Sequence, residues 1–294
     1  MMMAVGVTPN ASVGARREES FASGGAVNFY QALISADWNY KKIYSTTEKV
    51  MNTSKQVGAR IMQESVDGSI SFGITPATNT AWWRCGLGGT ASPYSQARPL
   101  SSMVLHIDRD TDAIYTSGDM IASIDIGSKQ GEELVANLSF EGKGYQTSTA
   151  LSPTYTSGDT PFLHSEGVFS FGGTADSDIT EFAISINNNL ITDLFANQKT
   201  RRDIPATKGV VTGNFTRLFQ NTTEYNTFIA ELPRAIIATY SRGSNQFILT
   251  LNKVRYVSEN ASISGQSGAI TEKFEFIAYV DDASTENDLT ITVS

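Results

Sequence analysis

Apolar and polar residues alternate along many short segments of this chain. Segment 69–74 reads Ser-Ile-Ser-Phe-Gly-Ile, and segment 182–186 reads Phe-Ala-Ile-Ser-Ile; segments 134–140, 247–251 and 274–276 follow the same rule. A spacing of two places the apolar side chains on one face of an extended strand and the polar ones on the other. The chain is therefore predicted to fold mainly into β-sheets with one buried and one wet face.

The composition points the same way. Ser, Thr and Asn together make up 80 of the 294 residues, and 24 residues are Gly. Short polar side chains compete with helical backbone hydrogen bonds and favour turns and exposed strand faces. Only the segments 78–87 and 222–232 have helical spacing, and each opens with a Thr that is suited to an N-cap.

The pattern of predicted elements occurs twice. Gly213 lies 145 residues after Gly68, and each glycine precedes alternating apolar residues, a short Thr-led helix and a Leu. Segment 103–107 matches segment 235–239 further on, and Phe140 in the last strand of the first copy matches Phe276. The first copy carries about fifteen extra residues between its helix and the next strand. A period this long indicates a duplicated globular domain, because solenoids need three or more short repeats.

A polar segment at 146–161 that contains Pro and Gly separates the two copies and is typical of a linker. We therefore predict an N-terminal arm at 1–21, a first domain at 22–148, a linker at 149–161 and a second domain at 162–294.

Several classes of protein are disfavoured. Asp and Glu exceed Lys and Arg by 30 to 22, so the net charge is −8, whereas nucleic-acid binders usually carry a basic surface. No apolar run approaches the roughly 18 residues that a membrane-spanning helix needs. The first residues lack the basic start and apolar core of a signal peptide. The one cysteine, Cys85, can form neither an internal disulfide nor a cysteine-based zinc site.

Residues suited to catalysis are scarce. His106 lies within an apolar strand segment and is expected to be structural, while His164 has no evident partner. Cys85 lies within the first helical segment and is expected to face the core. We therefore predict no enzyme activity, no catalytic residues and no cofactor.

One acidic motif has the spacing of a calcium-binding loop. Asp108, Asp110, Asp112 and Asp119 occupy positions 1, 3, 5 and 12, which carry oxygen ligands in such loops. However, Ala113 stands where that loop needs Gly, and the flanking segments are strands. The motif is interpreted as a hairpin loop with exposed carboxylates, and the four aspartates are kept as secondary metal candidates.

Several segments of the chain resemble the tail tube proteins of long-tailed bacteriophages, in the form with two tandem tube domains. The most specific is 182–190, Phe-Ala-Ile-Ser-Ile-Asn-Asn-Asn-Leu, which resembles the family's strand followed by an Asn-Asn-Leu segment. Segments 18–24, 68–72, 100–108 and 132–144 resemble other parts of the family in the same order.

This resemblance implies a mainly β protein with two tandem β-sandwich or barrel domains, each with one short helix. It implies a structural virion protein, assembled in the host cytoplasm, whose rings stack into the tail tube that conducts DNA. A two-domain subunit is expected to form homotrimeric rings with pseudo-sixfold symmetry. Expected partners are further copies of the chain and the tape measure, terminator and distal tail proteins. DNA would pass through the lumen without specific binding, and no membrane is involved. The arm and the loop 88–99 are expected to contact neighbouring rings.

Two other hypotheses remain open. The chain could be another β-protein of the phage tail or capsid, such as a distal tail, terminator or decoration protein. Alternatively, it could be a carbohydrate-binding β-sandwich that uses Trp38, Trp82 and Trp83 as a sugar platform.

Overall fold

The computed structural model describes residues 12–46, 59–78, 80–89, 91–109, 113–148, 153–155, 159–263, 268–281 and 287–294. The fold is mainly β, as predicted, with 57% strand and two short helices. In chain order the strands are β1 (Ser12–Arg17), β2 (Phe29–Gln31), β3 (Ser35–Thr46), β4 (Ala59–Gly73), β5 (Tyr94–Ser95), β6 (Met103–Asp108), β7 (Ala113–Lys129), β8 (Val135–Gly142), β9 (Gly144–Ser148), β10 (Gly167–Phe171), β11 (Thr174–Asp176), β12 (Ile179–Asn187), β13 (Val210–Leu218), β14 (Arg234–Arg242), β15 (Asn245–Ile263), β16 (Ile270–Ala278) and β17 (Thr290–Val293).

Eight of these strands form one continuous antiparallel sheet, which we call the central sheet. Its order is β3, β4, β8, β7, β12, β13, β16 and β15. The first four strands come from the first sequence repeat and the last four from the second. The two repeats are therefore joined by the ladder between β7 and β12, which runs from Glu181 opposite Lys129 to Asn187 opposite Ser123.

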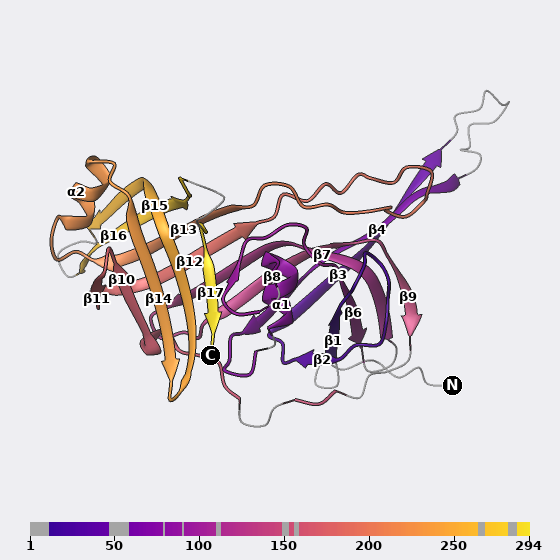
Figure 1. Ribbon diagram of the computed structural model, residues 1–294, viewed down its shortest axis with the longest axis horizontal. Coiled ribbons are helices and arrows are strands. Elements are labelled where there is room, and N and C mark those ends of the chain that lie inside the picture. Colours follow the sequence, from indigo (N-terminus) through magenta and orange to yellow (C-terminus); the bar gives the residue numbers. More distant parts are fainter. Residues whose placement is uncertain are drawn as a thin grey trace.

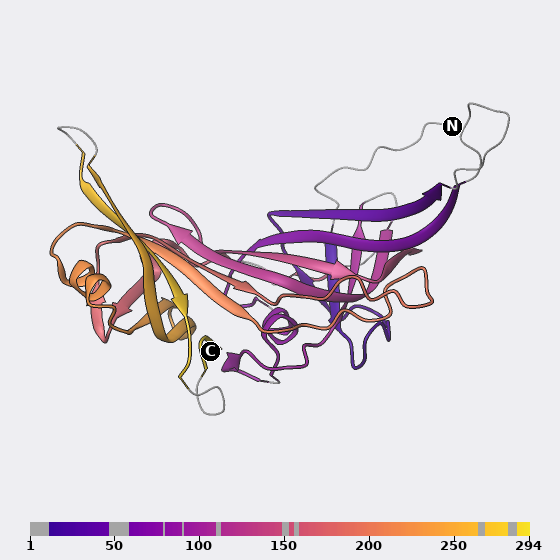
Figure 2. The ribbon, with the colours of Figure 1, turned by 90° about the horizontal axis from the view of Figure 1, so that it is seen from above.

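The long strands β7 and β15 also enter a second layer in each repeat. The first half of β7 pairs with β6 and β9, and β1 and β2 extend this layer. The first half of β15 likewise pairs with β14 and β17, and β10 and β11 follow. Figures 1 and 2 show these two groups of outer strands at opposite ends of an elongated molecule.

The sequence repeat is a repeat of structure. Gly68 on β4 lies opposite Phe140 on β8, and Gly213 on β13 lies opposite Phe276 on β16. Each glycine leaves room for the ring across from it, since an added Cβ would approach the ring carbon Cζ to 2.5 Å at Gly68 and 2.4 Å at Gly213. The predicted matches of Gly68 with Gly213 and of Phe140 with Phe276 are thus confirmed.

The predicted match of 103–107 with 235–239 is wrong by one residue. The β6–β7 ladder has an irregularity between Met103 and Leu105, and the β14–β15 ladder has one between Arg234 and Ile236. When the two ladders are aligned at these irregularities, Leu105 is equivalent to Ile236, and both residues are fully buried. A shift of one residue exchanges the two faces of a strand. The two segments share too little sequence identity for the register to be fixed from the sequence alone.

The two predicted helices are present as α1 (Ala81–Leu87) and α2 (Thr223–Ile229). Gly88 ends α1 with a φ of 93°, and its N–H donates to the carbonyl of Arg84. Thr222 occupies the N-cap of α2, but its side chain forms no capping hydrogen bond. Thr78 lies before α1, where its hydroxyl accepts the N–H of Thr75 at 2.8 Å.

The extra loop of the first repeat contacts the second repeat of the same chain. Its strand β5 pairs with β17, where Tyr94 lies opposite Ile291, and the Ser92 hydroxyl accepts the N–H of Val293 at 3.1 Å. The described part of this loop therefore makes these contacts within its own chain. They do not support the predicted role of the loop in contacts between rings. Residues 12–17 of the predicted arm also belong to the fold, because they form β1 and pair with β6.

A single large hydrophobic core cluster extends from Val13 to Ile291 and includes residues of both repeats. Trp83 of α1 packs against Phe247 of β15, with ring centroids 5.5 Å apart. Because the core is shared, the structure does not itself divide the chain into two domains. Within the described ranges, neither helix is long and apolar enough to span a membrane.

Replacing Gly213 by Ala is expected to lower the free energy of unfolding by about 1–3 kcal/mol, because the new methyl group overlaps Phe276 and the carbonyl of Ala183. Chemical denaturation measures this change. Gly144→Ala is the matched control, since its added Cβ meets only Thr200 at an ordinary 3.6 Å. Equal destabilisation by both changes would contradict the argument that Gly213 is needed to leave room for the ring of Phe276.

Candidate functional site

The central sheet has one apolar and one polar face, because its strands alternate in character. Ile126, Ile184 and Phe140 lie on the apolar face and are almost completely buried. The ladders place residues of the other parity together on the opposite side, which we call the polar face: Asp37, Asn39, Lys41, Asp67, Ser69, Ser123, Asp125, Lys129, Asn137, Ser139, Glu181, Ser185, Asn187, Thr212, Asn214, Ser258, Lys273 and Glu275.

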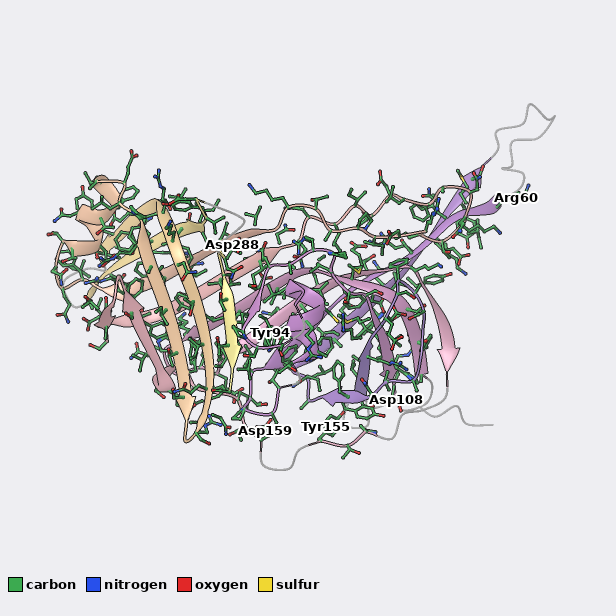
Figure 3. The ribbon with its side chains drawn as sticks, in the orientation of Figure 1. Arg60, Tyr94, Asp108, Tyr155, Asp159 and Asp288 are labelled. Carbon is green, nitrogen blue, oxygen red and sulfur yellow. The ribbon has the colours of Figure 1, made fainter. Side chains whose placement is uncertain are left out.

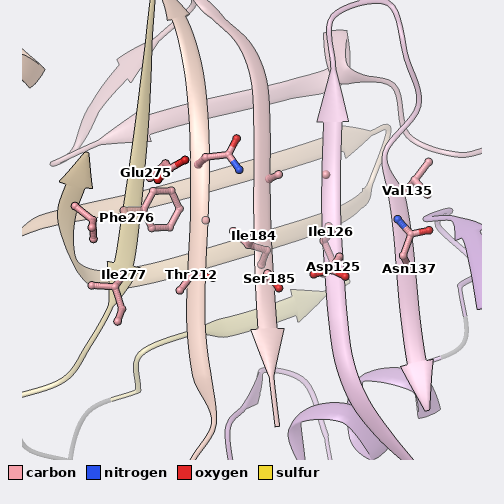
Figure 4. Close-up of a pocket in the computed structure, with 15 residues that line it drawn as sticks. Asp125, Ile126, Val135, Asn137, Ile184, Ser185, Thr212, Glu275, Phe276 and Ile277 are labelled. Atoms are coloured by element: carbon pink, nitrogen blue, oxygen red, sulfur yellow. The ribbon is translucent and has the colours of Figure 1, made fainter. Parts of the chain in front are cut away.

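Short polar side chains form rows across the strands of this face. Asp125 on β7 lies opposite Asn137 on β8 and Ser185 on β12, and Ser185 in turn lies opposite Thr212 on β13. The hydroxyls of Ser123 and Ser139 are 2.7 Å apart in the neighbouring row. Figure 4 shows Asp125, Asn137, Ser185 and Thr212 along a shallow groove of about 650 Å³ that crosses the junction between the two repeats.

The polar face has an acidic excess. Arg255 also lies on this face, opposite Ile277, so five carboxylates stand against four cations. Lys41 pairs with Asp67 at 2.6 Å. A further carboxylate, Glu141 at the edge of this face, is neutralised by Arg201 at 2.8 Å. Such a surface is wet and weakly acidic, so it repels polyanions and offers them no cluster of cations.

The structure separates Asp108 from Asp119, two of the four predicted metal candidates. Asp108 and Asp119 lie at opposite ends of the β6–β7 ladder, where they face Ala113 and Met103 respectively; Figure 3 shows Asp108 at the end of β6. Both are buried, so the prediction of exposed carboxylates is wrong for these two. Asp110 and Asp112 lie outside the described residues. Among the residues that the structure describes, no group of three or more His, Cys, Asp or Glu could hold a metal ion.

Asp119 is instead a buried acid within the first repeat. Thr116 forms a short hydrogen bond with one of its carboxyl oxygens, and the Thr116 hydroxyl also donates to the carbonyl of Leu105 at 3.2 Å. Burial raises the pKa of Asp119 to about 8, and the nearby charge of Glu18 acts in the same direction, against the hydrogen bond from Thr116. The equivalent residue of the second repeat is the apolar Val254, so this position tolerates a group without charge.

His164 has partners that the sequence did not reveal. Its Nδ1 lies 2.8 Å from the Ser128 hydroxyl, which lies 2.7 Å from the hydroxyl of Tyr240, and its Nε2 lies 2.9 Å from the carbonyl of Ile179. A serine beside a histidine can act as a nucleophile, but here both side chains are buried and no carboxylate orients the ring. The arrangement ties β7 of the first repeat to β12 and β14 of the second.

The other predicted candidates are structural. Cys85 is buried as expected, and burial raises the pKa of its thiol to about 12, so the thiol stays protonated. His106 is buried with its ring edge-on to Tyr115. Trp82 and Trp83 are 1% and 0% exposed, which removes them from any sugar-binding platform.

Two important polar residues carry no recognisable sequence signal. The buried carboxylate of Glu18 accepts the N–H groups of Gly24 and Gly118 and the hydroxyl of Ser102, at 2.7, 3.0 and 2.6 Å. Asn188 donates its side-chain amide to the carbonyls of Gly86 and Ile121, as described below. Both residues lie in segments that resemble a known family, although the resemblance assigned them no role.

Asp119→Asn should stabilise the protein relative to the parent by an amount that grows as the pH rises towards 8. The folded pKa exceeds the ordinary value of 3.8, so the folded state holds a proton that the unfolded state releases, and this contribution to stability is lost as the pH rises through about 8. The gain should grow by at most about 1.4 kcal/mol per pH unit. Urea unfolding at pH 5 to 8 measures it, with Asp125→Asn on the polar face as the control. A stability difference that is constant with pH would contradict the burial argument.

Comparison with known proteins adds an independent finding. The phage tail tube protein family matches residues 6–278 of the chain, which include all eight strands of the central sheet. No curated protein matches the chain.

Proposed function

The chain belongs to the phage tail tube protein family, and we propose that it is the major tube subunit, which stacks as rings to form the DNA-conducting tube. Proteins of this family are structural, typically non-enzymatic, and their place is the virion tail. The observation that carries the proposal is the central sheet, whose polar face is continuous over both repeats and whose two outermost strands have free edges.

The free edges favour assembly. Among the described strands, β3 forms a ladder with β4 alone, and β15 beyond Val254 forms one with β16 alone. Unpaired strand edges favour pairing with another chain unless they are covered. A sheet with an open edge at each end closes when copies join into a ring.

Three copies would complete the ring. Each chain supplies eight strands from two equivalent repeats, so three chains supply 3 × 8 = 24 strands with pseudo-sixfold symmetry. The β7–β12 ladder would then be the joint within a chain, and a related joint between chains would alternate with it around the ring. Cyclic closure of this kind satisfies every edge of the sheet.

The polar face would line the lumen. Rows of hydroxyl and amide groups keep the channel wet, and the small excess of carboxylates over cations weakens contact with the phosphates of passing DNA. Transit needs a surface without specific contacts, and no cluster of basic side chains stands on the described part of this face.

The finer organisation follows from the two repeats. We propose tube domains at 22–148 and 162–294, a linker at 149–161 and an N-terminal arm at 1–21, part of which joins the first domain as β1. In the host cytoplasm the rings would stack with one another and meet the tape measure, terminator and distal tail proteins.

Thiol labelling of assembled tubes tests this proposal. Asp125→Cys places a thiol on the polar face, and Ser244→Cys places one in the exposed turn between β14 and β15. In unassembled protein both should react with a maleimide bearing a bulky polymer, whereas in tubes only Ser244→Cys should react. The native Cys85 is buried and serves as the silent background.

Electron microscopy of the same samples gives the second readout. Long tubes are expected, with Asp125→Cys protected along them. Rings that never stack would favour a distal tail, terminator or decoration protein, and free reaction of Asp125→Cys in tubes would place the polar face outside.

A further inference from the structure

The second repeat has an exposed apolar groove beside α2. Its lining comprises Thr227, Phe228, Ile229, Glu231, Leu232, Arg255, Tyr256 and Val257, and its volume is about 410 Å³. We call it the α2 groove. Ile229, Leu232 and Val257 are 62%, 56% and 63% exposed, which is unusual for apolar side chains that lie together.

The equivalent place in the first repeat is filled. There, α1 and the irregularity of β7 at Ile121 correspond to α2 and the irregularity of β15 at Tyr256. Leu87, the counterpart of Leu232, is fully buried. Two segments fill it: Asn188, which directly follows β12, and the insertion, whose Ala97 donates its N–H to the carbonyl of Leu87 at 2.7 Å.

Asn188 makes four hydrogen bonds and has no exposed surface. Its N–H donates to the carbonyl of Ala122 at 2.8 Å, and its side chain donates to the carbonyls of Gly86 and Ile121 at 2.8 and 2.9 Å. Its side-chain oxygen accepts from Arg98 at 3.1 Å. The end of β12 is thus fastened to both α1 and β7.

The chain has a second strand equivalent to β12. β3 pairs with β4 as β12 pairs with β13, and the matched glycines fix the register, because Trp38 lies opposite Gly68 and Ile184 lies opposite Gly213. Lys42 is therefore the counterpart of Asn188. Figures 1 and 3 show β3 and β4 extending away from the body of the molecule, with Arg60 near the far end.

We propose that the free edge of β15 and the α2 groove receive β3 of a second copy of this chain, in the register that β12 takes on β7. Asn39 then lies opposite Asn260, as Ser185 lies opposite Asp125 within the chain. The N–H of Lys42 meets the carbonyl of Val257, and Tyr44 lies over the groove. This inference rests on the proposed assembly into rings and specifies the joint between chains.

The two surfaces are complementary in character. Tyr44 on β3 is 51% exposed and lies on the same face of the strand as Lys42, so it brings apolar surface to an apolar groove. Lys42 has ammonium N–H donors where Asn188 has amide donors, and Glu231 in the groove supplies a carboxylate. Burying these exposed side chains favours association.

Disulfide trapping tests the register. In tubes oxidised under mild conditions, Asn39→Cys combined with Asn260→Cys should link chains covalently, giving dimers and higher species on a non-reducing gel. The control combines Asn39→Cys with Ala261→Cys, whose side chain points to the other face of β15 and should remain unlinked.

The possible outcomes distinguish a failure of the proposed joint between chains from a failure of the proposed tube function. Tubes that form without any link at 39 and 260, or that link equally in the control, would overturn the joint and leave the tube proposal standing. A parent chain that forms neither rings nor tubes would overturn the tube proposal itself.

A surface variant tests the groove separately. Leu232→Lys should weaken ring formation by at least about tenfold, as expected for a central interface residue, while leaving the melting temperature of the monomer unchanged because the side chain is exposed. Val168→Lys, at a site 58% exposed on β10, is the matched control and should assemble normally. An equal loss of assembly in both variants, or in neither, would overturn the role of the groove.

Discussion

The backbone ladder between β7 and β12 is the interaction on which the rest of the structure depends. It converts two four-stranded sheets into one sheet of eight and aligns their polar faces. A strand buried against a core must satisfy its backbone N–H and carbonyl groups, and this ladder does so at the centre of the molecule. In the described chain the outer edges of β3 and of β15 beyond Val254 have no ladder. The joint that we propose between chains would use these edges as the ladder within the chain uses β7 and β12.

The two repeats keep the same ladders but fill their interiors differently. Where the first repeat has Phe72 opposite Ala136, the second has Arg217 opposite Glu272, and Arg217 also pairs with Asp176 at 3.1 Å. Burial raises the pKa of Glu272, and the charge of Arg217 opposes that shift. A buried ion pair adds little net stability compared with apolar packing, but losing one partner is costly. The two repeats therefore share their backbone pairing and their contacts between a glycine and a phenylalanine on the neighbouring strand. Other buried positions, such as Phe72 and Arg217, differ between them.

Much of this fold could be predicted from the sequence, because its strands alternate strictly and both helices stand out from them. The match of Gly68 with Gly213 located the repeat, and the contacts with Phe140 and Phe276 explain why glycine occupies both positions. The polar face follows from the same alternation. Long-range contacts could not be predicted: the partners of His164 come from strands far apart in the chain, and Asp119, which looked like a loop ligand, turned out to be buried in β7.

The insertion in the first repeat strengthens the joint between the two repeats within the chain. Strand β5 pairs with β17, and Trp83 packs against Phe247, so the joint inside the chain gains contacts that reach well beyond the β7–β12 ladder. The second repeat has no such insertion, and the α2 groove stays open. A joint between chains that follows the same register would lack these additional contacts and would be the weaker of the two. In the proposed assembly, rings would form from folded monomers, and the strength of each outer joint would depend on how well β3 of the next chain fills the groove.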